Sequence, residues 1–367
     1  MLVWETLTVQ FNYHGDWTGL YDIGAQLQLP PELAAEDVYR FPNSAGYDGQ
    51  FYHLIAHDPF LARGYARFVD NPGLRWRRIL VPALAHAVVF GEDERVDSAY
   101  FAVLLGFVGL GVYWTSRYFA RIGWRPAWGA LFLAIPATMT SIDRATVDVA
   151  LLALCAGFAL YALEEREAPL WVVLALAPLA RETGLALIGG YCLWLFVERR
   201  FSRMAWFACA ALPAIVWFVF VRARTGPDQT PWTSIVPLEG LVRRTLHPVQ
   251  FALTTGWLRE AAMLDYLGVI GVWFALGVTA WWLWHYRPLT PLVAVIAVLA
   301  AGAMFLQSPD IWAQDYSFAR TQSPLLACLA LEGAATARWE SLPPLVLCLL
   351  RVVFQLEPQL KGILRGV

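Results

Sequence analysis

Nine apolar stretches alternate with short polar segments along most of the chain. A helix that crosses the hydrocarbon core of a bilayer needs about 20 apolar residues. Several stretches are shorter than that, so we expect tilted or partly re-entrant helices. The pattern predicts an all-α polytopic membrane helix bundle of about nine to ten membrane helices. The stretches cover residues 99–119, 126–142, 145–163, 169–197, 204–222, 264–286, 290–307, 322–336 and 342–356.

Charge in the short loops sets the expected orientation. Cytoplasmic loops carry an excess of Lys and Arg, and arginines gather in this way within residues 117–125 and 199–203. By alternation, residues 1–98 form a large first extracytoplasmic loop region, and residues 99–367 form the transmembrane bundle of a single integral membrane domain. The same outer side is expected for residues 141–148, 223–262 and 307–322.

The stretch 169–197 does not fit one straight crossing. Cytoplasmic-type charge flanks both of its ends, and Pro178, Arg181 and Glu182 lie near its middle in "PLARETG". Irregular backbone at membrane depth is tolerated where it lines a cavity. We therefore expect two shorter helices that meet at a break facing the outer side.

The first residues, "MLVWETLTVQF", are too few to span a bilayer, and the acidic Glu5 is unfavourable in a signal peptide. If residues 12–98 lie outside, a preceding segment must carry the chain across the membrane. We expect that the first membrane helix is missing or truncated, rather than that the topology is inverted.

The composition agrees with a membrane protein. Of the 367 residues, 58% are hydrophobic and 15% are charged, and the mean hydropathy is +0.50, which is too apolar for one water-soluble core. The net charge of −2 gives no signal for nucleic acid as a partner. The five cysteines lie in apolar stretches without CxxC spacing, which is typical of small buried residues rather than of metal ligands or disulfides.

A polar segment, "GYDGQFYHLIAHDP" at residues 46–59, precedes the first long apolar stretch. This segment and four other outer segments carry ionisable residues, which are costly near hydrocarbon and usually mark a site. Each residue also has a simpler interpretation: Arg181 and Glu182 as a buried ion pair, for example, or Asp148 as the cap of a polar turn. Because the residues converge from five segments, we expect an extracytoplasmic site.

Five motifs follow one another in these segments: "GYDGQFYHLIAHDP", "RWRRILVPALAHAV", "DRATVDVALLAL", "PLARETGLAL" and "DYSFARTQSPLL". In order and spacing they resemble the GT-C superfamily of membrane glycosyltransferases. The resemblance covers residues 12–335 and is closer to the bacterial branch that is grouped with mannosyltransferases and lipopolysaccharide core-sugar transferases. The chain departs from the pattern in the missing first membrane helix, which normally precedes the acidic loop.

The resemblance implies a multi-pass enzyme of the bacterial inner membrane whose active site faces the periplasm or the cell exterior. Its donor would be a sugar linked to a polyprenyl phosphate, and its acceptor a hydroxyl group of a lipid, a glycan or a protein. Such a transfer needs a carboxylate that takes the proton of the acceptor, and cationic or hydrogen-bonding groups that neutralise the departing phosphate.

Asp48 is the predicted base, because it lies in the external loop where the GT-C enzymes that this chain resembles keep theirs. Gly49 follows it and would let backbone and substrate approach closely. Asp16 is the rival base. A single base favours inversion at the anomeric carbon, whereas a second carboxylate nearby would allow retention.

The planar fork of arginine suits bidentate contacts with phosphate, and the candidates are Arg320, Arg181 and the pair Arg77 and Arg78, in that order. Arg320 comes first because "SFARTQSPLL" enters a helix from an external loop, a position where GT-C enzymes resemble one another in placing a phosphate ligand. Glu182 would orient Arg181 or pair with it. The predicted substrate-binding set is completed by Tyr47, Gln50, Asp143 and Asp148.

Two groupings could hold a divalent cation, although none is required. His53 and His57 lie four residues apart and would share a helix face, which is a spacing that metal sites use. Lone histidines in a polar loop are, however, more often hydrogen-bonded at the surface. Asp48 with Asp143 or Asp148 could hold a cation instead, as in some members of the superfamily, whereas other members need no metal.

Two other functions stay open. A membrane transporter or lipid flippase would distribute its charges through the membrane depth and show a repeat between its halves, but the charges here cluster at one face and no repeat is visible. A non-catalytic relative of the GT-C enzymes is the second alternative, which the missing first helix favours.

Overall fold

The computed structural model describes the chain except for residues 36–37, 228–231, 248–255, 286–288, 314 and 367. Parts of the expected outer segments 223–262 and 307–322 therefore lie outside the described residues. The fold is nearly all helical. Its one two-stranded sheet within the described chain is parallel and pairs Ile23 with Arg40 and Gly24 with Phe41.

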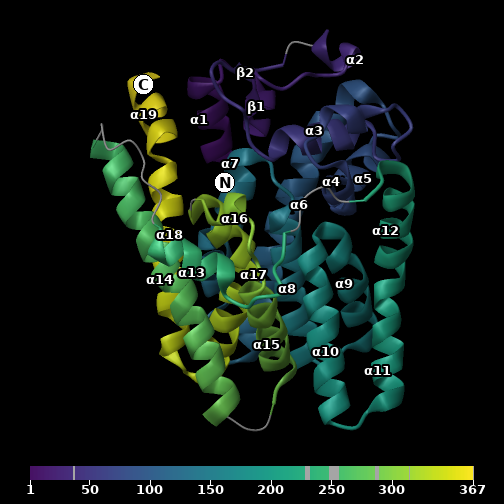
Figure 1. The fold of residues 1–367 in the computed structure, drawn as a ribbon, viewed down its shortest axis with the longest axis vertical. Coiled ribbons are helices and arrows are strands. Elements are labelled where there is room, and N and C mark those ends of the chain that lie inside the picture. The colour runs from purple at the N-terminus through teal and green to yellow at the C-terminus, as the bar shows by residue number, and fades with distance from the viewer. Residues whose placement is uncertain (36–37, 228–231, 248–255, 286–288, 314, 367) are drawn as a thin grey trace.

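The first part of the chain consists of short elements that gather at one end of the molecule (Figure 1). They are α1 (Leu2–Asn12), η1 (Trp17–Tyr21), β1 (Ile23–Gly24), α2 (Pro31–Ala34), β2 (Arg40–Phe41), α3 (Gly49–His57), η2 (Tyr65–Phe68), α4 (Pro72–Arg77) and α5 (Leu80–Val88).

The rest of the chain forms a bundle of longer helices. Its elements are α6 (Asp93–Arg121), η3 (Pro126–Ala134), α7 (Pro136–Arg144), α8 (Asp148–Leu163), α9 (Glu167–Ala180), η4 (Glu182–Gly184), α10 (Leu185–Val197), α11 (Phe201–Ala208), η5 (Cys209–Ala211), α12 (Leu212–Thr225), α13 (Glu239–Leu246), α14 (Gly256–His285), α15 (Pro291–Met304), α16 (Pro309–Trp312), α17 (Asp315–Thr336), η6 (Trp339–Ser341), α18 (Leu342–Gln355) and α19 (Glu357–Gly366).

The expected membrane-type helix bundle is confirmed at this level, with fewer full-length spans than the apolar pattern predicts. Among the described residues, four helical stretches are long and apolar enough to cross a membrane, and four further apolar helices are shorter. The long ones are Asp93–Arg121, Phe201–Thr225, Gly256–His285 and Trp339–Gly366. The shorter ones are Asp148–Leu163, Glu167–Ala180, Glu182–Val197 and Pro291–Met304.

The hydrophobic pattern predicts one helix over residues 126–142, and this prediction is wrong. The stretch forms the 3₁₀ segment η3 followed by α7. Ile135 between them is extended, with φ −75° and ψ 134°. The ring of Pro136 disfavours a helical conformation in the residue before it, so the chain turns at this point. Hydrophobicity alone could not place this break.

Helix α8 forms the centre of the bundle. It is apolar all round and almost every residue from Asp148 to Leu160 is buried, which is the pattern of a helix enclosed by others. Helices α6, α9 and α17 pack against it. Because α8 begins at Asp148, the bundle core reaches directly up to the charged residues at the end where the first elements gather.

The break within "PLARETG" is confirmed. Helix α9 ends at Ala180, Arg181 is extended with φ −161°, and η4 leads into α10. A Cβ atom on Gly184 would lie 2.3 Å from the carbonyl of Ala177, so the two short helices approach each other more closely here than a side chain would allow. The turn places Arg181 and Glu182 in the wall of the same cavity that Arg75 and Arg78 line.

Candidate functional site

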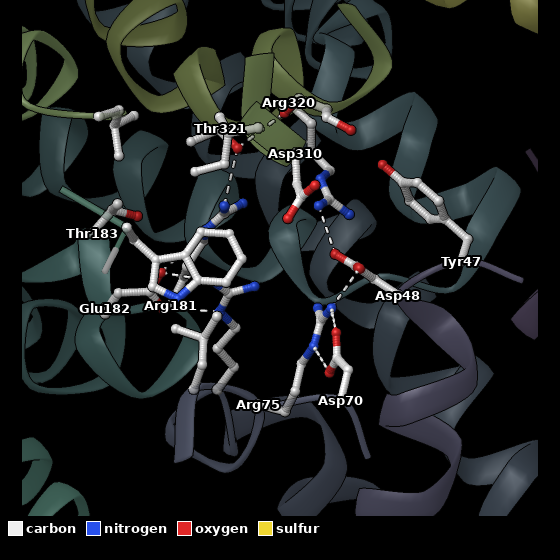
Figure 2. Close-up of a pocket in the computed structure, with 16 residues that line it drawn as sticks. Tyr47, Asp48, Asp70, Arg75, Arg181, Glu182, Thr183, Asp310, Arg320 and Thr321 are labelled. Atoms are coloured by element: carbon white, nitrogen blue, oxygen red, sulfur yellow. Dashed lines mark hydrogen bonds and ion pairs between the residues drawn. The ribbon is translucent and has the colours of Figure 1, made fainter. Parts of the chain in front are cut away.

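A polar cavity of about 260 Å³ lies where α3, α4, the break before η4 and the start of α17 meet (Figure 2). Four arginines and four acidic residues contribute to its wall, so their formal charges cancel. They are Arg75, Arg78, Arg181, Arg320, Asp48, Asp70, Glu182 and Asp310. The wall also includes Tyr47, Leu74, Thr183, Trp232, Leu306, Ile311, Ser317 and Thr321.

Asp48 lies between two guanidinium groups. Its Oδ1 is 2.9 Å from Nη2 of Arg75, and its Oδ2 accepts a hydrogen bond from Nη2 of Arg320 at 2.6 Å. Burial alone would raise the pKa of this carboxyl, but Arg75 and Arg320 outweigh burial and hold the pKa well below its usual range. These two contacts therefore favour the ionised form of Asp48.

Arg75 is fixed from several sides. Its Nε and Nη2 donate to Asp70 at 3.0 and 2.8 Å, and its guanidinium lies 4.8 Å from the centre of the Phe51 ring. Helix α4 is itself capped, because the side chain of Asn71 accepts a hydrogen bond from the backbone of Leu74. These contacts aim Arg75 at Asp48 without any ligand.

Arg78 and Glu182 form the second charged pair of the wall. Nε and Nη2 of Arg78 donate to the two oxygens of Glu182 at 2.9 and 2.7 Å, and Nη1 donates to the hydroxyl of Tyr52. This bidentate geometry joins α4 to the break before η4. Glu182 lies 3.9 Å from Nε of Arg181, so its principal partner is Arg78 and not the neighbouring arginine.

Arg181 points back toward the start of α8. It pairs with Asp148 and donates to the hydroxyl of Thr321 at 3.1 Å. Asp148 also lies 3.7 Å from Nε of Arg320, so one carboxylate behind the wall serves two arginines. Among the described residues, Nε and Nη1 of Arg320 and Nε of Arg181 find no hydrogen-bond partner, which leaves donors that an anion could satisfy.

The structure thus brings together Asp48, Tyr47, Arg78, Arg181 and Arg320 from the sequence-predicted set, with Glu182 and with Asp148 behind them. Tyr47 lies over the Arg320 guanidinium, 5.0 Å from ring centre to Cζ. The aromatic ring and the carboxylate next to it in sequence therefore contact the same arginine.

Other predicted residues lie elsewhere. Asp16 accepts hydrogen bonds from the backbone and hydroxyl of Thr18 and caps η1. Gln50 donates to the carbonyl of Ala45 and accepts from the backbone of Gly24, so it fastens a loop. Neither residue lines the polar cavity, because local loop contacts engage both side chains.

Asp143 and Arg77 are also placed differently from the prediction. Asp143 is buried in a separate network with Tyr316, Arg144 and Gln359, where the Gln359 Nε2 donates to it at 2.8 Å. Arg77 does not line the polar cavity, because adjacent residues of a helix point about 100° apart and Arg78 takes the direction of the cavity. Arg77 lies over the ring of Phe218 and lines the adjoining groove instead. Among the described residues, neither Asp48 nor Asp143 belongs to a group of three possible metal ligands.

Sequence reasoning missed Arg75 and Asp70 as site residues. A signal was present, because Arg75 and Arg78 in "RWRR" are three residues apart and so share a face of α4. The predicted pair, Arg77 and Arg78, does not have this spacing, and adjacent residues of a helix point in different directions. Asp70 precedes the helix cap and carried no such signal.

An apolar groove of about 760 Å³ adjoins the polar cavity. The two share Leu74, Glu182, Thr183, Trp232, Leu306 and Thr321 in their walls. Beyond this border the groove runs between α10, α15 and α17 and is lined mainly by aliphatic residues. The apolar residues are Leu185, Ala186, Val298, Leu299, Gly302, Ala303 and Leu325, and the polar residues Arg77, Thr233 and Gln322 complete the wall.

Comparison of the chain with known protein families, with curated proteins and with solved structures finds no match. The fold and the site define a helical bundle of membrane type, in which a polar cavity lined by paired charges adjoins an apolar groove.

Gly49 allows a close approach between the start of α3 and the backbone of Arg144, and not between the protein and a substrate in the polar cavity. A Cβ atom there would lie 2.2 Å from the carbonyl oxygen of Arg144. We expect Gly49→Ala to lower the free energy of unfolding by about 1–3 kcal/mol through overpacking. Gly106→Ala in α6 is the matched control, because outside the backbone of its own helix no described residue comes within 4 Å of its Cβ position. Denaturant unfolding in detergent measures both, and equal stability of the two variants would refute this interpretation of the α3–α7 contact.

Proposed function

We propose that this protein is a membrane glycosyltransferase that moves a sugar from a polyprenyl-phosphate donor to a hydroxyl group of a lipid, a glycan or a protein. One observation carries the proposal: an acidic side chain held between arginines lies in a polar cavity that adjoins an apolar groove. An ionic chamber beside an aliphatic groove suits a ligand with an anionic head and a long apolar tail.

The donor would lie across the border of the two cavities. Its phosphate would contact Arg320, Arg181 and Arg75, whose forks suit oxyanions, and the first isoprene units would enter the groove between α10 and α15. The sugar would then occupy the polar cavity beside Asp48 and Tyr47. On this proposal the site faces the extracytoplasmic side of a bacterial inner membrane, as the arginine pattern of the loops predicts.

The transfer is a displacement at the anomeric carbon. The acceptor oxygen forms a bond to that carbon, the bond from the carbon to the phosphate oxygen breaks, and polyprenyl phosphate leaves with the electron pair. Asp48 takes the proton of the acceptor hydroxyl. The arginines neutralise the charge that develops on the departing phosphate. A single base on one side of the sugar favours inversion.

The low pKa of Asp48 would make it a weak base, and the donor itself removes this difficulty. Phosphate oxygens compete with the carboxylate for Arg320 and Arg75. When these arginines turn to the phosphate, Asp48 loses positive neighbours while it stays buried, and its pKa rises. The base therefore becomes effective only in the presence of the donor, which would limit wasteful reactions of the free enzyme.

A lipid flippase would also bind a lipid phosphate, but it would not break the bond to the sugar. Incubation of the purified protein with a panel of polyprenyl-phosphate sugars and acceptors separates the two classes. Sugar transfer or donor hydrolysis supports the proposal, whereas binding and translocation of an intact lipid would replace it.

Asp48→Asn should lower the transfer rate by about 10²–10⁴-fold, because the variant keeps the shape but loses the base. Asp16→Asn is the matched control and should leave the rate within a few-fold, because Asp16 only caps η1. The measurement is the initial rate at saturating donor, with folding of each variant checked by size-exclusion chromatography. Asp48→Glu retains the charge for the arginines but moves the carboxylate by one methylene group, so it should also lower the rate through misplacement of the base, and it provides a second variant if Asp48→Asn folds poorly. Normal transfer by a folded Asp48→Asn protein would exclude Asp48 as the base.

Gly302→Phe should raise the KM for the polyprenyl-phosphate sugar by about tenfold or more, because the new ring would fill the apolar groove. Gly277→Phe in α14 is the control. Both glycines are exposed, and within the described part of the chain nothing lies within 4 Å of either Cβ position, so only their location differs. The same KM in both variants would mean that the groove does not receive the donor tail.

A further inference from the structure

Two buried histidines of α3 face a carboxylate of α6, away from the polar cavity. Nε2 of His53 lies 3.4 Å from Oδ1 of Asp97, and Nε2 of His57 lies 3.6 Å from the same oxygen. The His53 and His57 side chains are completely enclosed, and Asp97 is 21% exposed. One ligand atom from each residue lies within 4.8 Å of the others, and none of the three residues lines the polar cavity.

These distances suit a tetrahedral metal site. Zinc bonds of about 2.0–2.1 Å to imidazole nitrogen and carboxylate oxygen place neighbouring ligand atoms about 3.3 Å apart in a tetrahedron. The two separations from Asp97, 3.4 and 3.6 Å, are close to this value. The partial exposure of Asp97 leaves a direction from which a water molecule could supply a fourth ligand.

The hydrogen bonds around the three residues also fit a metal. Nδ1 of His57 lies 3.2 Å from Oδ1 of Asp93, which is the carboxylate–histidine arrangement that orients metal-binding imidazoles. The hydroxyl of Tyr21 donates to Asp97 at 2.8 Å and holds its carboxylate toward the histidines. Asp93 is itself paired with Arg63 at 2.8 Å.

His53 is the residue that a simple ion-pair cluster does not explain. His57 has a carboxylate oxygen near each ring nitrogen, because its Nδ1 lies 3.2 Å from Asp93 and its Nε2 lies 3.6 Å from Asp97, so an ion-pair cluster would satisfy that residue. Among the described residues, neither ring nitrogen of His53 has a hydrogen-bond partner, although its Nε2 is in ion-pair range of Asp97. A fully buried imidazole without a hydrogen bond is costly, and a metal ion would satisfy it.

We propose that His53, His57 and Asp97 bind one divalent transition-metal ion of the zinc class. Two imidazoles and one carboxylate favour zinc or a neighbouring first-row metal over magnesium or calcium, which prefer oxygen ligands. The ion would join α3 to α6 and so fix the helix that begins directly after Asp48. Its role is structural and does not depend on the proposed glycosyl transfer.

The test measures metal content of the full-length protein in detergent. Protein exposed to ZnSO₄ and then freed of excess metal should hold about one zinc per chain by mass spectrometry of the metal. Added zinc should raise the melting temperature relative to chelator-treated protein. Co²⁺ in place of zinc should give the visible absorption bands of a tetrahedral site. None of these readouts involves transfer activity, so their outcome is separate from that of the proposed function.

His53→Gln should remove most of the bound zinc, the cobalt spectrum and the stabilisation by metal. Asp97→Asn should act in the same way and serves as a second variant if His53→Gln folds poorly. His86→Gln is the matched control, because His86 is half-buried, lies 3.2 Å from the Ala56 carbonyl of α3 and packs beside the Phe60 ring, and it does not belong to the group of three possible ligands. Folded wild-type protein that binds no zinc, or zinc binding that survives both variants, would overturn the proposal.

Discussion

The contact of the Asp48 carboxylate with the guanidinium groups of Arg75 and Arg320 is the interaction on which the rest of the site depends. It joins the start of α3 to α4, which follows soon after in sequence, and to α17, which lies more than 200 residues further along the chain. Buried charges of this kind need each other, because removing one partner leaves the other without compensation at a cost of about 3–5 kcal/mol. The same contacts set the orientation of the cavity wall, so the stability of the fold and the geometry of the site are linked.

The bundle and the charged end depend on each other. Helix α8 is enclosed by apolar neighbours along its length, yet it begins with Asp148, which pairs with Arg181. The short helix α3 similarly carries Asp48 before its first turn and the two histidines on its later turns. Short helices and a helix break at one end of the apolar bundle thus hold the charged groups in place. The groove between α10 and α15 begins where this charged end meets the bundle.

The sequence predicts the features that depend on local pattern. The long apolar stretches indicated the helical bundle, and Pro178 with Arg181 and Glu182 indicated the break, because a proline and two charges rarely share a straight apolar helix. The extended residue before Pro136 was locally encoded but overlooked. Asp48 and Arg320 were predicted to share one site, but their direct ion pair and the part of Arg75 in it were not predicted, since such contacts depend on how the segments pack. Asp143 was misplaced for the same reason, because its partner Gln359 lies near the C-terminal end of the chain.

The affinity of sugar-free polyprenyl phosphate for Asp48→Asn protein tests the central claim most directly. If the carboxylate competes with phosphate for the two arginines, its removal should tighten binding relative to wild type, by about tenfold for each 1.4 kcal/mol of competition that is lost. Native mass spectrometry or a binding titration in detergent measures the change. Equal or weaker binding by a folded Asp48→Asn protein would show that Asp48 does not exchange its arginines with a phosphate, and would contradict the account.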